Sequence, residues 1–347
     1  MFNRTSENQA AGHFSANRVH GLSQEKTPPP DTHDQIWTSV QVAENSENFD
    51  VAEEILSKAI RQQISPEHTA LYLGELALIN LARKRYDKVL DICRNLLGNA
   101  STIEAQHPFL YLNLIACQEI AGFLQAGNDV AEVPFRSQTL KFVISGYNSE
   151  LEIQHIRHKL YEPEEVELIL KHMGEEDIVL DLGANVGNHA IALAATRPAA
   201  TIHVFEPIKK TCALLRRNIA LNGLTNIDTS NLDIAVDSED GVLNMVQRIN
   251  LASSREATEG IGPAIPKRAL RSLWPERVDF IKMDVEGAEL RIIKSVLDLI
   301  RRDRTKIILE CYKITAERDF ADLAELGLEQ IDCIERAAVF NVLVQPK

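Results

Sequence analysis

The 347-residue sequence contains no uncharged apolar stretch that approaches the ~20 residues a membrane-spanning helix needs. Its N-terminus also lacks a basic segment followed by an apolar run, so we expect no signal peptide. The five cysteines are widely spaced and form no Cys-x-x-Cys pair, which indicates buried thiols in a reducing compartment. Together these absences predict a cytoplasmic protein without a membrane span.

Positive charge is also scarce, because 37 Lys and Arg stand against 50 Asp and Glu and give a formal net charge of −13. This balance argues against a nucleic-acid surface. The arginine pairs 216–217 and 301–302 are interpreted as solvated helix faces. What is present is an ordinary soluble composition, 45% hydrophobic and 25% charged, with length for about two domains.

Composition and periodicity divide the chain into four parts. Residues 1–35 are polar and end near a proline triplet, which predicts a disordered leader. Residues 36–125 show helical periodicity and predict an all-α domain. Residues 126–144 change character and are interpreted as a linker. Residues 145–347 alternate strand-like and helix-like segments, as an α/β domain does.

The helical part contains a spaced aromatic pattern. Tyr86 heads an apolar helix, and Phe49 and Phe123 lie about 37 residues before and after it. This spacing and the segment YLGELALINLARKRYDKVLDICRNLL resemble the tetratricopeptide repeat, a stack of helical hairpins. A plain helical bundle packed on the second domain explains the pattern equally well. A repeat array would offer a surface to a protein partner, and neither alternative supplies catalytic residues.

The second half is organised around residues 178–195, IVLDLGANVGNHAIALAA. A buried strand is predicted to end at Asp181, a turn bracketed by Gly183 and Gly187 follows, and an Ala- and Leu-rich helix comes next. A dinucleotide fingerprint would place glycine in the middle of this turn, where Asn185 stands. Its side chain would crowd a pyrophosphate but suits a zwitterionic amino-acid moiety. Asp181 suits an ammonium or sulfonium group.

Two further acidic positions are candidates for binding a nucleoside. Glu206 ends the next predicted strand, near the ~20-residue offset at which an acidic side chain meets the ribose hydroxyls. Asp233, at the end of a third strand expected around 229–235, is a candidate for the adenine amino group, with Asp237 and Asp240 as competitors.

A second motif, VDFIKMDVEGAELRIIKSVLDLI, begins with a strand that contains Lys282 and ends at Asp284. Because ligands of open α/β sheets bind at the carboxyl ends of strands, Asp284 and Glu286 are expected to flank the reacting group. Glu310, near the end of the strand KIILEC, is a third candidate. No metal site is predicted, since Asp284 would need further oxygen ligands and the His155-x-x-His158 pair has no third ligand in view.

Five blocks in order resemble the FkbM family of S-adenosylmethionine-dependent methyltransferases: LDLGANVGNHA, VFEPIKKTCALLRRNIALNGL, FIKMDVEGAEL, IILECY and NVLVQP. The resemblance covers residues 145–347. It implies an α/β fold with a Rossmann-like class I methyltransferase sheet of seven strands, the last reversed, here preceded by an all-α helical-hairpin domain. It also implies S-adenosylmethionine (AdoMet) as cofactor and, as acceptor, a hydroxyl on a sugar, glycan or secondary metabolite.

The resemblance also assigns roles to the candidate residues. The methionine end of AdoMet would be held by Asp181, Gly183, Asn185 and Gly187, the ribose by Glu206 and the adenine by Asp233. The methyl group and acceptor would be faced by Asp284, Glu286 and Glu310. Asp284 is the first candidate for the carboxylate that takes the acceptor's proton. Two alternatives stay open: a catalytically idle scaffold that uses the helical half, and an NAD-linked oxidoreductase, against which Asn185 argues.

Overall fold

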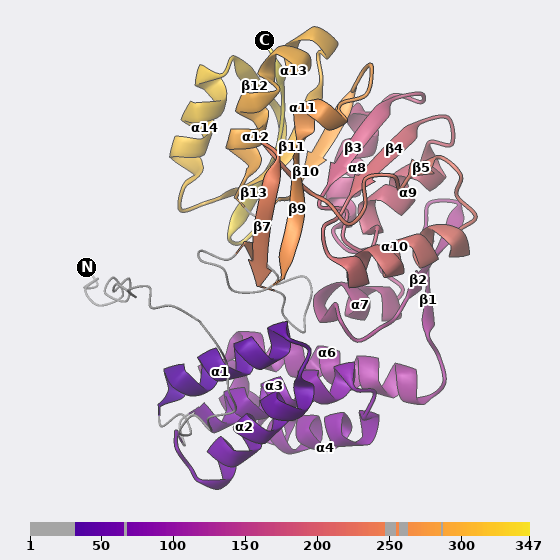
Figure 1. Ribbon diagram of the computed structural model, residues 1–347. Coiled ribbons are helices and arrows are strands. Elements are labelled where there is room, and N and C mark those ends of the chain that lie inside the picture. The colour runs from indigo at the N-terminus through magenta and orange to yellow at the C-terminus, as the bar shows by residue number, and fades with distance from the viewer. Residues whose placement is uncertain (1–31, 66–67, 247–254, 257–262, 286) are drawn as a thin grey trace.

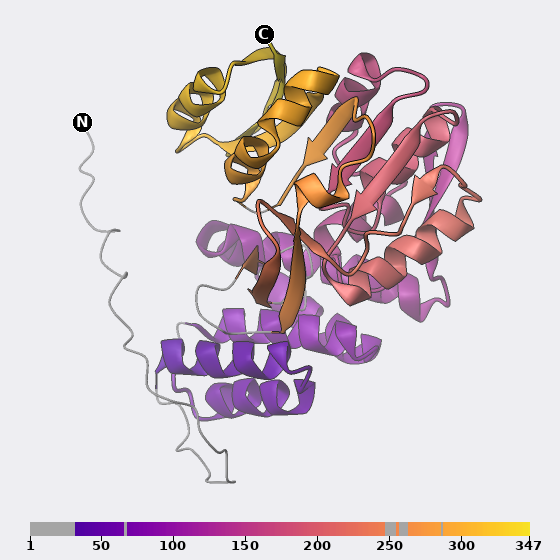
Figure 2. The same cartoon turned by 45° about the horizontal axis from the view of Figure 1, so that its top comes forward.

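The computed structural model describes residues 32–65, 68–246, 255–256, 263–285 and 287–347 (Figures 1 and 2). Residues 1–31 of the predicted leader lie outside the described part of the chain. The first described helix begins at His33. Glu286, one of the candidate catalytic residues, also lies outside the described residues.

The N-terminal half is helical throughout its described part. Its helices are α1 (His33–Asn45), α2 (Phe49–Arg61), α3 (Thr69–Ala82), α4 (Tyr86–Leu97), α5 (Ala100–Gln106) and α6 (Pro108–Gln125). The helix α3 is apolar on nearly all of its surface, and it is buried because its neighbours α2, α4 and α6 pack around it. The predicted helical character of residues 36–125 is therefore confirmed, while the tetratricopeptide repeat stays a prediction.

Residues 126–144 differ from the predicted linker, because they contain a β-hairpin of β1 (Val130–Phe135) and β2 (Gln138–Val143). The hairpin side chains buried in the core of the α/β half are Val133, Phe135, Leu140 and Phe142. The backbone of β2 is also fixed, since the N–H of Lys141 donates to Asn222 at 2.9 Å and the N–H of Val143 donates to Asn218 at 2.8 Å. The segment is thus part of the folded α/β half.

The α/β half is built on a mostly parallel sheet, which in the described part of the chain has seven strands ordered β12-β13-β11-β10-β3-β4-β5. The strands are β3 (Ile178–Leu182), β4 (Thr201–Phe205), β5 (Ile227–Asp228), β10 (Phe280–Met283), β11 (Lys306–Tyr312), β12 (Leu328–Glu335) and β13 (Val339–Pro346). The last strand, β13, runs antiparallel to both β11 and β12, and the other pairs are parallel. The predicted sheet with its reversed final strand is confirmed.

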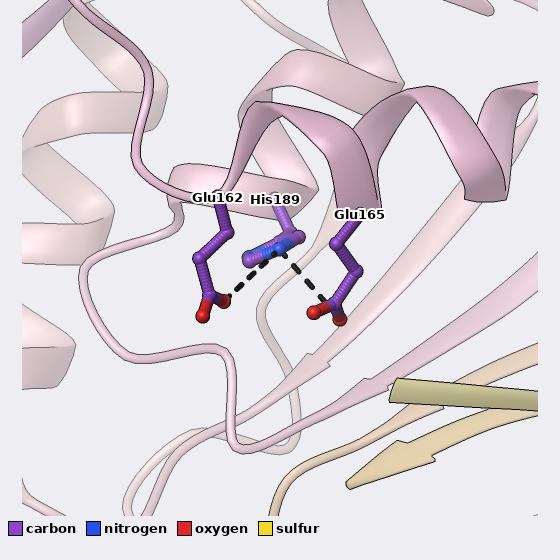
Figure 3. A group of neighbouring side chains, drawn as sticks. All are labelled: Glu162, Glu165 and His189. Carbon is purple, nitrogen blue, oxygen red and sulfur yellow. Dashed lines mark ion pairs between the residues drawn. The ribbon is translucent and has the colours of Figure 1, made fainter. Parts of the chain in front are cut away.

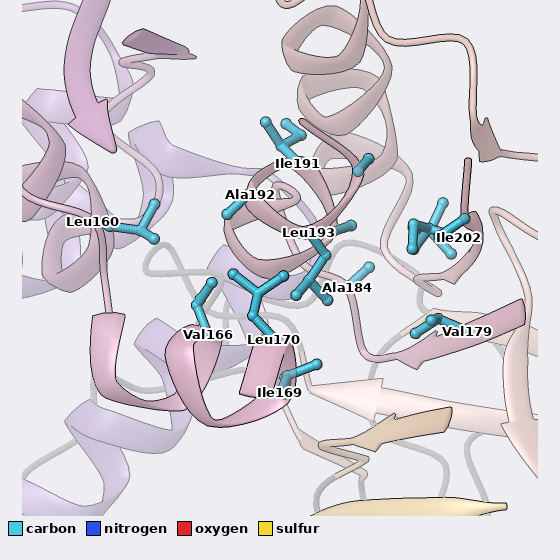
Figure 4. Close-up of a cluster of buried hydrophobic side chains, with 14 of the residues drawn as sticks. Leu160, Val166, Ile169, Leu170, Val179, Ala184, Ile191, Ala192, Leu193 and Ile202 are labelled. Atoms are coloured by element: carbon cyan, nitrogen blue, oxygen red, sulfur yellow. The ribbon is translucent and has the colours of Figure 1, made fainter. Parts of the chain in front are cut away.

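Helices cover both faces of this sheet (Figure 1). They are α8 (Pro163–His172), α9 (Asn188–Thr196) and α10 (Lys209–Leu221) on one face, and α11 (Leu270–Leu273), α12 (Glu289–Ser295), α13 (Leu297–Asp303) and α14 (Ala316–Glu325) on the other. Successive strand residues point to opposite faces, so β3 sends Val179 into the first core and Leu180 into the second. Figure 4 shows part of the first core, to which α8 contributes Ile169 and α9 contributes Leu193.

The helix α7 (Ser149–Ile156) connects the two halves, since it packs against α6 and against β1. A second, small sheet carries the strands β6 (Ala235–Asp237), β9 (Ala264–Ala269), β7 (Gly241–Val246) and β8 (Arg255–Glu256) in that order. The third strand expected around 229–235 was misplaced: β5 ends at Asp228, β6 begins at Ala235, and Asp233 between them has φ 67. Within the described ranges, no helix is both long and apolar enough to cross a membrane.

Candidate functional site

Two cavities lie at the carboxyl ends of the parallel strands, and Asn185 and Asp284 line both of them. Asn185 follows β3 and Asp284 follows the neighbouring strand β10, so the sheet brings them to the same edge. The apolar cavity is the one whose lining includes Phe205, Ile208, Ile234, Val236, Val285 and Ala288. The acidic cavity is the one whose lining includes Glu150, Glu162, Glu165 and Glu310.

The turn after β3 has an unusual backbone, with positive φ at Gly183 (86°), Asn185 (50°) and Gly187 (91°). Both glycines serve close packing within the protein. A Cβ on Gly183 would lie 2.0 Å from the carbonyl oxygen of Asp284, and one on Gly187 would lie 2.4 Å from Cδ1 of Leu215. The backbone contact makes glycine necessary at position 183, whereas at position 187 the positive φ is the stronger reason for glycine. Gly183, but not Gly187, also lines the apolar cavity as described.

The N–H groups of the first three residues of this turn are bonded inside the protein. Those of Gly183 and Ala184 donate to the carbonyl oxygen of Phe205 at 3.0 and 2.9 Å. That of Asn185 donates to Oε2 of Glu206 at 3.1 Å. A phosphate cradle needs such groups free, so the described geometry does not favour a pyrophosphate here.

Glu206, at the end of β4, both shapes the turn and lines the apolar cavity. It is buried, and its Oε1 accepts from the N–H of Ile208 at 2.9 Å while Oε2 accepts from Asn185. Burial raises the pKa of Glu206 to about 7, although these backbone hydrogen bonds oppose the shift. Glu206, which is predicted to bind the ribose, thus lies at the edge of the apolar cavity. Part of its hydrogen-bonding capacity is already used within the protein.

The sequence named Asp237 as a competitor of Asp233 for the adenine amino group, but it did not indicate the ionic cluster to which Asp237 belongs in the lining of the apolar cavity. Asp237 accepts from Nζ of Lys267 at 2.8 Å and from Nε of Arg291 at 2.7 Å, and all three residues line the cavity. Burial raises the pKa of Asp237, but hydrogen bonds from Arg291 and Lys267 outweigh it and lower the pKa to about 2. Asp233 is instead paired with Arg216 at 3.1 Å and is not in the described lining of either cavity.

Asp181 lies beneath the turn, paired with the buried Lys282. It is fully buried, 3.6 Å from Nζ of Lys282, and outside the described lining of both cavities. Lys282 also lies 3.3 Å from Oδ2 of Asp284 and donates to the carbonyl oxygen of Gly183. Burial lowers the pKa of Lys282, but Asp284 and Asp181 raise it well above its ordinary value. Asp181 therefore contacts the residues of the site through the cationic Lys282 and does not itself line either cavity as described.

The acidic cavity gathers carboxylates from distant parts of the chain. Asp284, whose side chain is 54% exposed, lines this cavity together with Glu310. Burial raises the pKa of Glu310, and the charges of Asp284 and Glu162 raise it further. Glu162 and Glu165 were missed, although their spacing places both at the start of α8. Burial raises the pKa of Glu165 to about 8.

Glu289, in the first turn of α12, has a structural role. Its Oε1 accepts from the N–H groups of Val285 and Gly287, both at 3.2 Å, and so fixes the chain before α12. Glu286, which lies between those two residues, is outside the described part of the chain.

Comparisons with known proteins bear on this half of the chain. Residues 181–332 match the family model of the methyltransferase FkbM domain. Methyltransferase sdnD of Sordaria araneosa is 27% identical over 164 residues, which cover 37% of this chain and 63% of that protein. The hexuronic acid methyltransferase AglP of Haloferax volcanii is 25% identical over 170 residues, which cover 46% of this chain and 68% of that protein. The chain thus spans just under two thirds of the Sordaria protein.

Solved structures align with this chain at low similarity. The crystal structure of methyltransferase FkbM from Methylobacillus flagellatus KT is 15% identical with a TM-score of 0.37, covering 67% of this chain and 54% of that one. The TYW2 structure from M. jannaschii in complex with AdoMet is 14% identical with a TM-score of 0.36, covering 62% of this chain and 84% of that one. At these scores neither structure bears on function.

Proposed function

We propose that this protein transfers a methyl group from AdoMet to a hydroxyl group of a sugar, a glycan or another polyhydroxylated small molecule. The observation that carries the proposal is the wall that Asn185 and Asp284 form between the apolar and acidic cavities. A transferase must hold donor and acceptor on either side of one reacting centre, because alignment of the two supplies much of the rate.

The residues of the apolar cavity fit AdoMet in chemical terms. Apolar side chains such as Ile234 and Val236 suit an adenine ring. Glu206 at the end of β4 suits the ribose hydroxyls, which donate hydrogen bonds to a carboxylate. Asn185, at the junction with the acidic cavity, suits the amino-acid end, and Asp284 beside it would lie near the methyl group and the acceptor. AdoMet supplies an activated methyl group on a positively charged sulfur.

The protein's own contribution to the reaction would be positioning and proton acceptance. A bond forms between the acceptor oxygen and the methyl carbon, the sulfur–methyl bond breaks, and its electron pair stays on sulfur. The acceptor oxygen loses its proton, for which Asp284 is the first candidate because it lines both cavities and is partly exposed. Lys282 holds this carboxylate at 3.3 Å and so orients it.

The lining of the acidic cavity supports an acceptor rich in hydroxyl groups. Carboxylates such as Glu150 and Glu310 accept hydrogen bonds, and the side chains of Tyr161 and Asn341 add further polar groups. The name of the Haloferax relative places a hexuronic acid among the acceptors used by proteins similar to this chain. Both points favour a sugar over a purely apolar acceptor.

The two alternatives predict different ligands. An NAD-linked oxidoreductase would bind a dinucleotide, yet the N–H groups of Gly183 and Asn185 are bonded within the protein. An idle scaffold would need neither cavity. We propose the methyltransferase because it uses both.

The direct test is methyl transfer from isotope-labelled AdoMet to a panel of monosaccharides, uronic acids and glycan fractions. The full-length protein should label at least one oxygen-rich acceptor and release S-adenosylhomocysteine. Release of labelled methyl groups in no fraction, together with hydride exchange from NADH, would favour the oxidoreductase. Binding of neither cofactor would favour the scaffold.

A further inference from the structure

Two glutamates and a histidine converge where α8 and α9 begin (Figure 3). Glu162 is the residue before α8, Glu165 lies in its first turn, and His189 lies in the first turn of α9. Nε2 of His189 is 3.8 Å from Oε2 of Glu162 and 3.7 Å from Oε1 of Glu165. One possible ligand atom from each residue lies within 4.8 Å of the others.

The imidazole of His189 points at these carboxylates without making a hydrogen bond (Figure 3). His189 is 7% exposed, and its Nε2 has no hydrogen-bond partner in the described part of the chain. Burial, with the charges of Lys282 and Arg336, holds the pKa of His189 well below its ordinary value, so the ring is neutral. A buried polar atom left without a partner costs about 1–3 kcal/mol, so the gap between the three side chains calls for an occupant.

A metal ion fits this gap. With metal–ligand bonds of about 2.1 Å, Nε2 of His189 and either carboxylate oxygen would subtend roughly 125° at the ion, since they lie 3.8 and 3.7 Å apart. That angle is slightly wider than tetrahedral, and movements of a few tenths of an ångström would close the difference.

The outward oxygens of both glutamates already have partners. Arg336 donates to Oε1 of Glu162, and Asn341 donates to Oε2 of Glu165. The remaining oxygens, Oε2 of Glu162 and Oε1 of Glu165, are the ones nearest to His189. Outer hydrogen bonds that orient ligating carboxylates in this way are usual around metal centres.

We propose that Glu162, Glu165 and His189 bind a divalent transition-metal ion at the wall of the acidic cavity. Mixed imidazole and carboxylate ligands favour Mn²⁺, Fe²⁺ or Zn²⁺ over Mg²⁺ and Ca²⁺, which prefer oxygen ligands. Because Glu162 and Glu165 line the acidic cavity, open coordination positions of the ion would face it. The role of the ion rests on the proposed function: it would bind hydroxyl or carboxylate oxygens of the acceptor and orient them toward Asp284.

The test is metal binding by the full-length protein alone, without AdoMet or acceptor. Protein stripped with a chelator is titrated with Mn²⁺ or Zn²⁺ by calorimetry. Wild type should bind about one ion per chain, and His189→Gln and Glu165→Gln should each bind about 100-fold more weakly or worse. The matched control is His155→Gln, a buried histidine on α7 whose Nε2 is hydrogen-bonded to Asn188 at 3.1 Å and which should not affect the affinity.

A second measurement uses only the wild-type protein, so it remains informative if a variant fails to fold. Pulsed electron paramagnetic resonance of the wild-type Mn²⁺ complex should show coupling to a nitrogen of one imidazole. Absence of Mn²⁺ and Zn²⁺ binding, absence of nitrogen coupling, or equal affinity in wild type and both ligand variants would overturn the proposal. The outcome is independent of catalysis: intact metal binding without methyl transfer contradicts the proposed function, whereas methyl transfer without metal binding contradicts this site.

Discussion

Gly183 and Asp284 meet where β3 and β10 end, and a Cβ on Gly183 would lie only 2.0 Å from the carbonyl oxygen of Asp284. This contact joins the two segments that carry most of the candidate site. It also gives a reason for the first glycine of the turn that is independent of any ligand: the chain after β10 occupies the space of a side chain.

Gly183→Ala should therefore destabilise the protein by more than its positive φ alone accounts for. Gly127 is the matched control, because its φ of 85° equals that of Gly183 within a degree and nothing lies within 4 Å of its Cβ position. We expect about 1–2 kcal/mol for Gly127→Ala from the left-handed backbone and a clearly larger loss for Gly183→Ala. Urea unfolding measures both, and equal losses would show that the contact with Asp284 relaxes freely.

Phe142 tests whether the hairpin β1–β2 belongs to the α/β core. Its side chain is fully buried and stacks on His155 with ring centroids 3.9 Å apart. Phe142→Ala should lower the free energy of unfolding by about 3–5 kcal/mol, as for other buried phenylalanines. Phe109, 82% exposed on α6, is the control, and its replacement by alanine should change stability by about 0.5 kcal/mol or less. A small effect at Phe142 would restore the linker interpretation.

His155 should make stability depend on pH. Burial lowers its pKa to about 4 from an ordinary value of 6.5, so the folded state resists a protonation that the unfolded chain accepts. The contribution of neutral His155 to the free energy of unfolding is therefore complete above pH 6.5. This contribution, up to about 3 kcal/mol, is lost as the pH falls toward 4. His155→Gln can keep the bond to Asn188 but cannot titrate. The difference in unfolding free energy between wild type and this variant should shrink with acidification, and a constant difference would contradict the burial of a neutral His155.

Asp284→Asn separates chemistry from binding. Asparagine keeps the shape and can still accept a hydrogen bond from Lys282, but it cannot take a proton. If Asp284 is the proton acceptor, AdoMet affinity should be nearly unchanged while methyl transfer falls by about 10²–10⁴-fold. The control is Asp298→Asn, a surface residue of α13 paired with Arg271, which should leave both quantities alone. An unchanged rate in Asp284→Asn would transfer the role to Glu310 or Glu286.

Local patterns explain why much of the sheet and its edge could be predicted. The strands ending at Asp181 and Asp284 are short apolar runs before glycine turns, and the carboxyl-edge rule brings Asn185 beside Asp284 without further information. The same rule does not say which way a strand-end side chain points. Asp181 is in register with Lys282 on β10, so the two side chains share one side of the sheet and pair under the turn.

The parts that could not be predicted depend on contacts between distant segments. Asp237 meets Arg291 across 54 positions of the chain, and Glu165 meets His189 through the packing of α8 on α9. The hairpin β1–β2 was read as a linker because its short alternating pattern says nothing about what covers it. Such long-range contacts depend on the whole fold. The periodicity of a single sequence indicates local structure and does not indicate which distant segments pack together.

The central claim, that the apolar cavity binds AdoMet through the carboxylate of Glu206, is tested most directly by calorimetric titration of the full-length protein with AdoMet across pH. Because the pKa of Glu206 is about 7 and the ribose hydroxyls donate to the ionised form, affinity should rise roughly tenfold from about pH 6 to about pH 8. Glu206→Gln should bind more weakly and lose this dependence on pH. A complete absence of AdoMet binding, or tight binding of NADH in its place, would contradict the account.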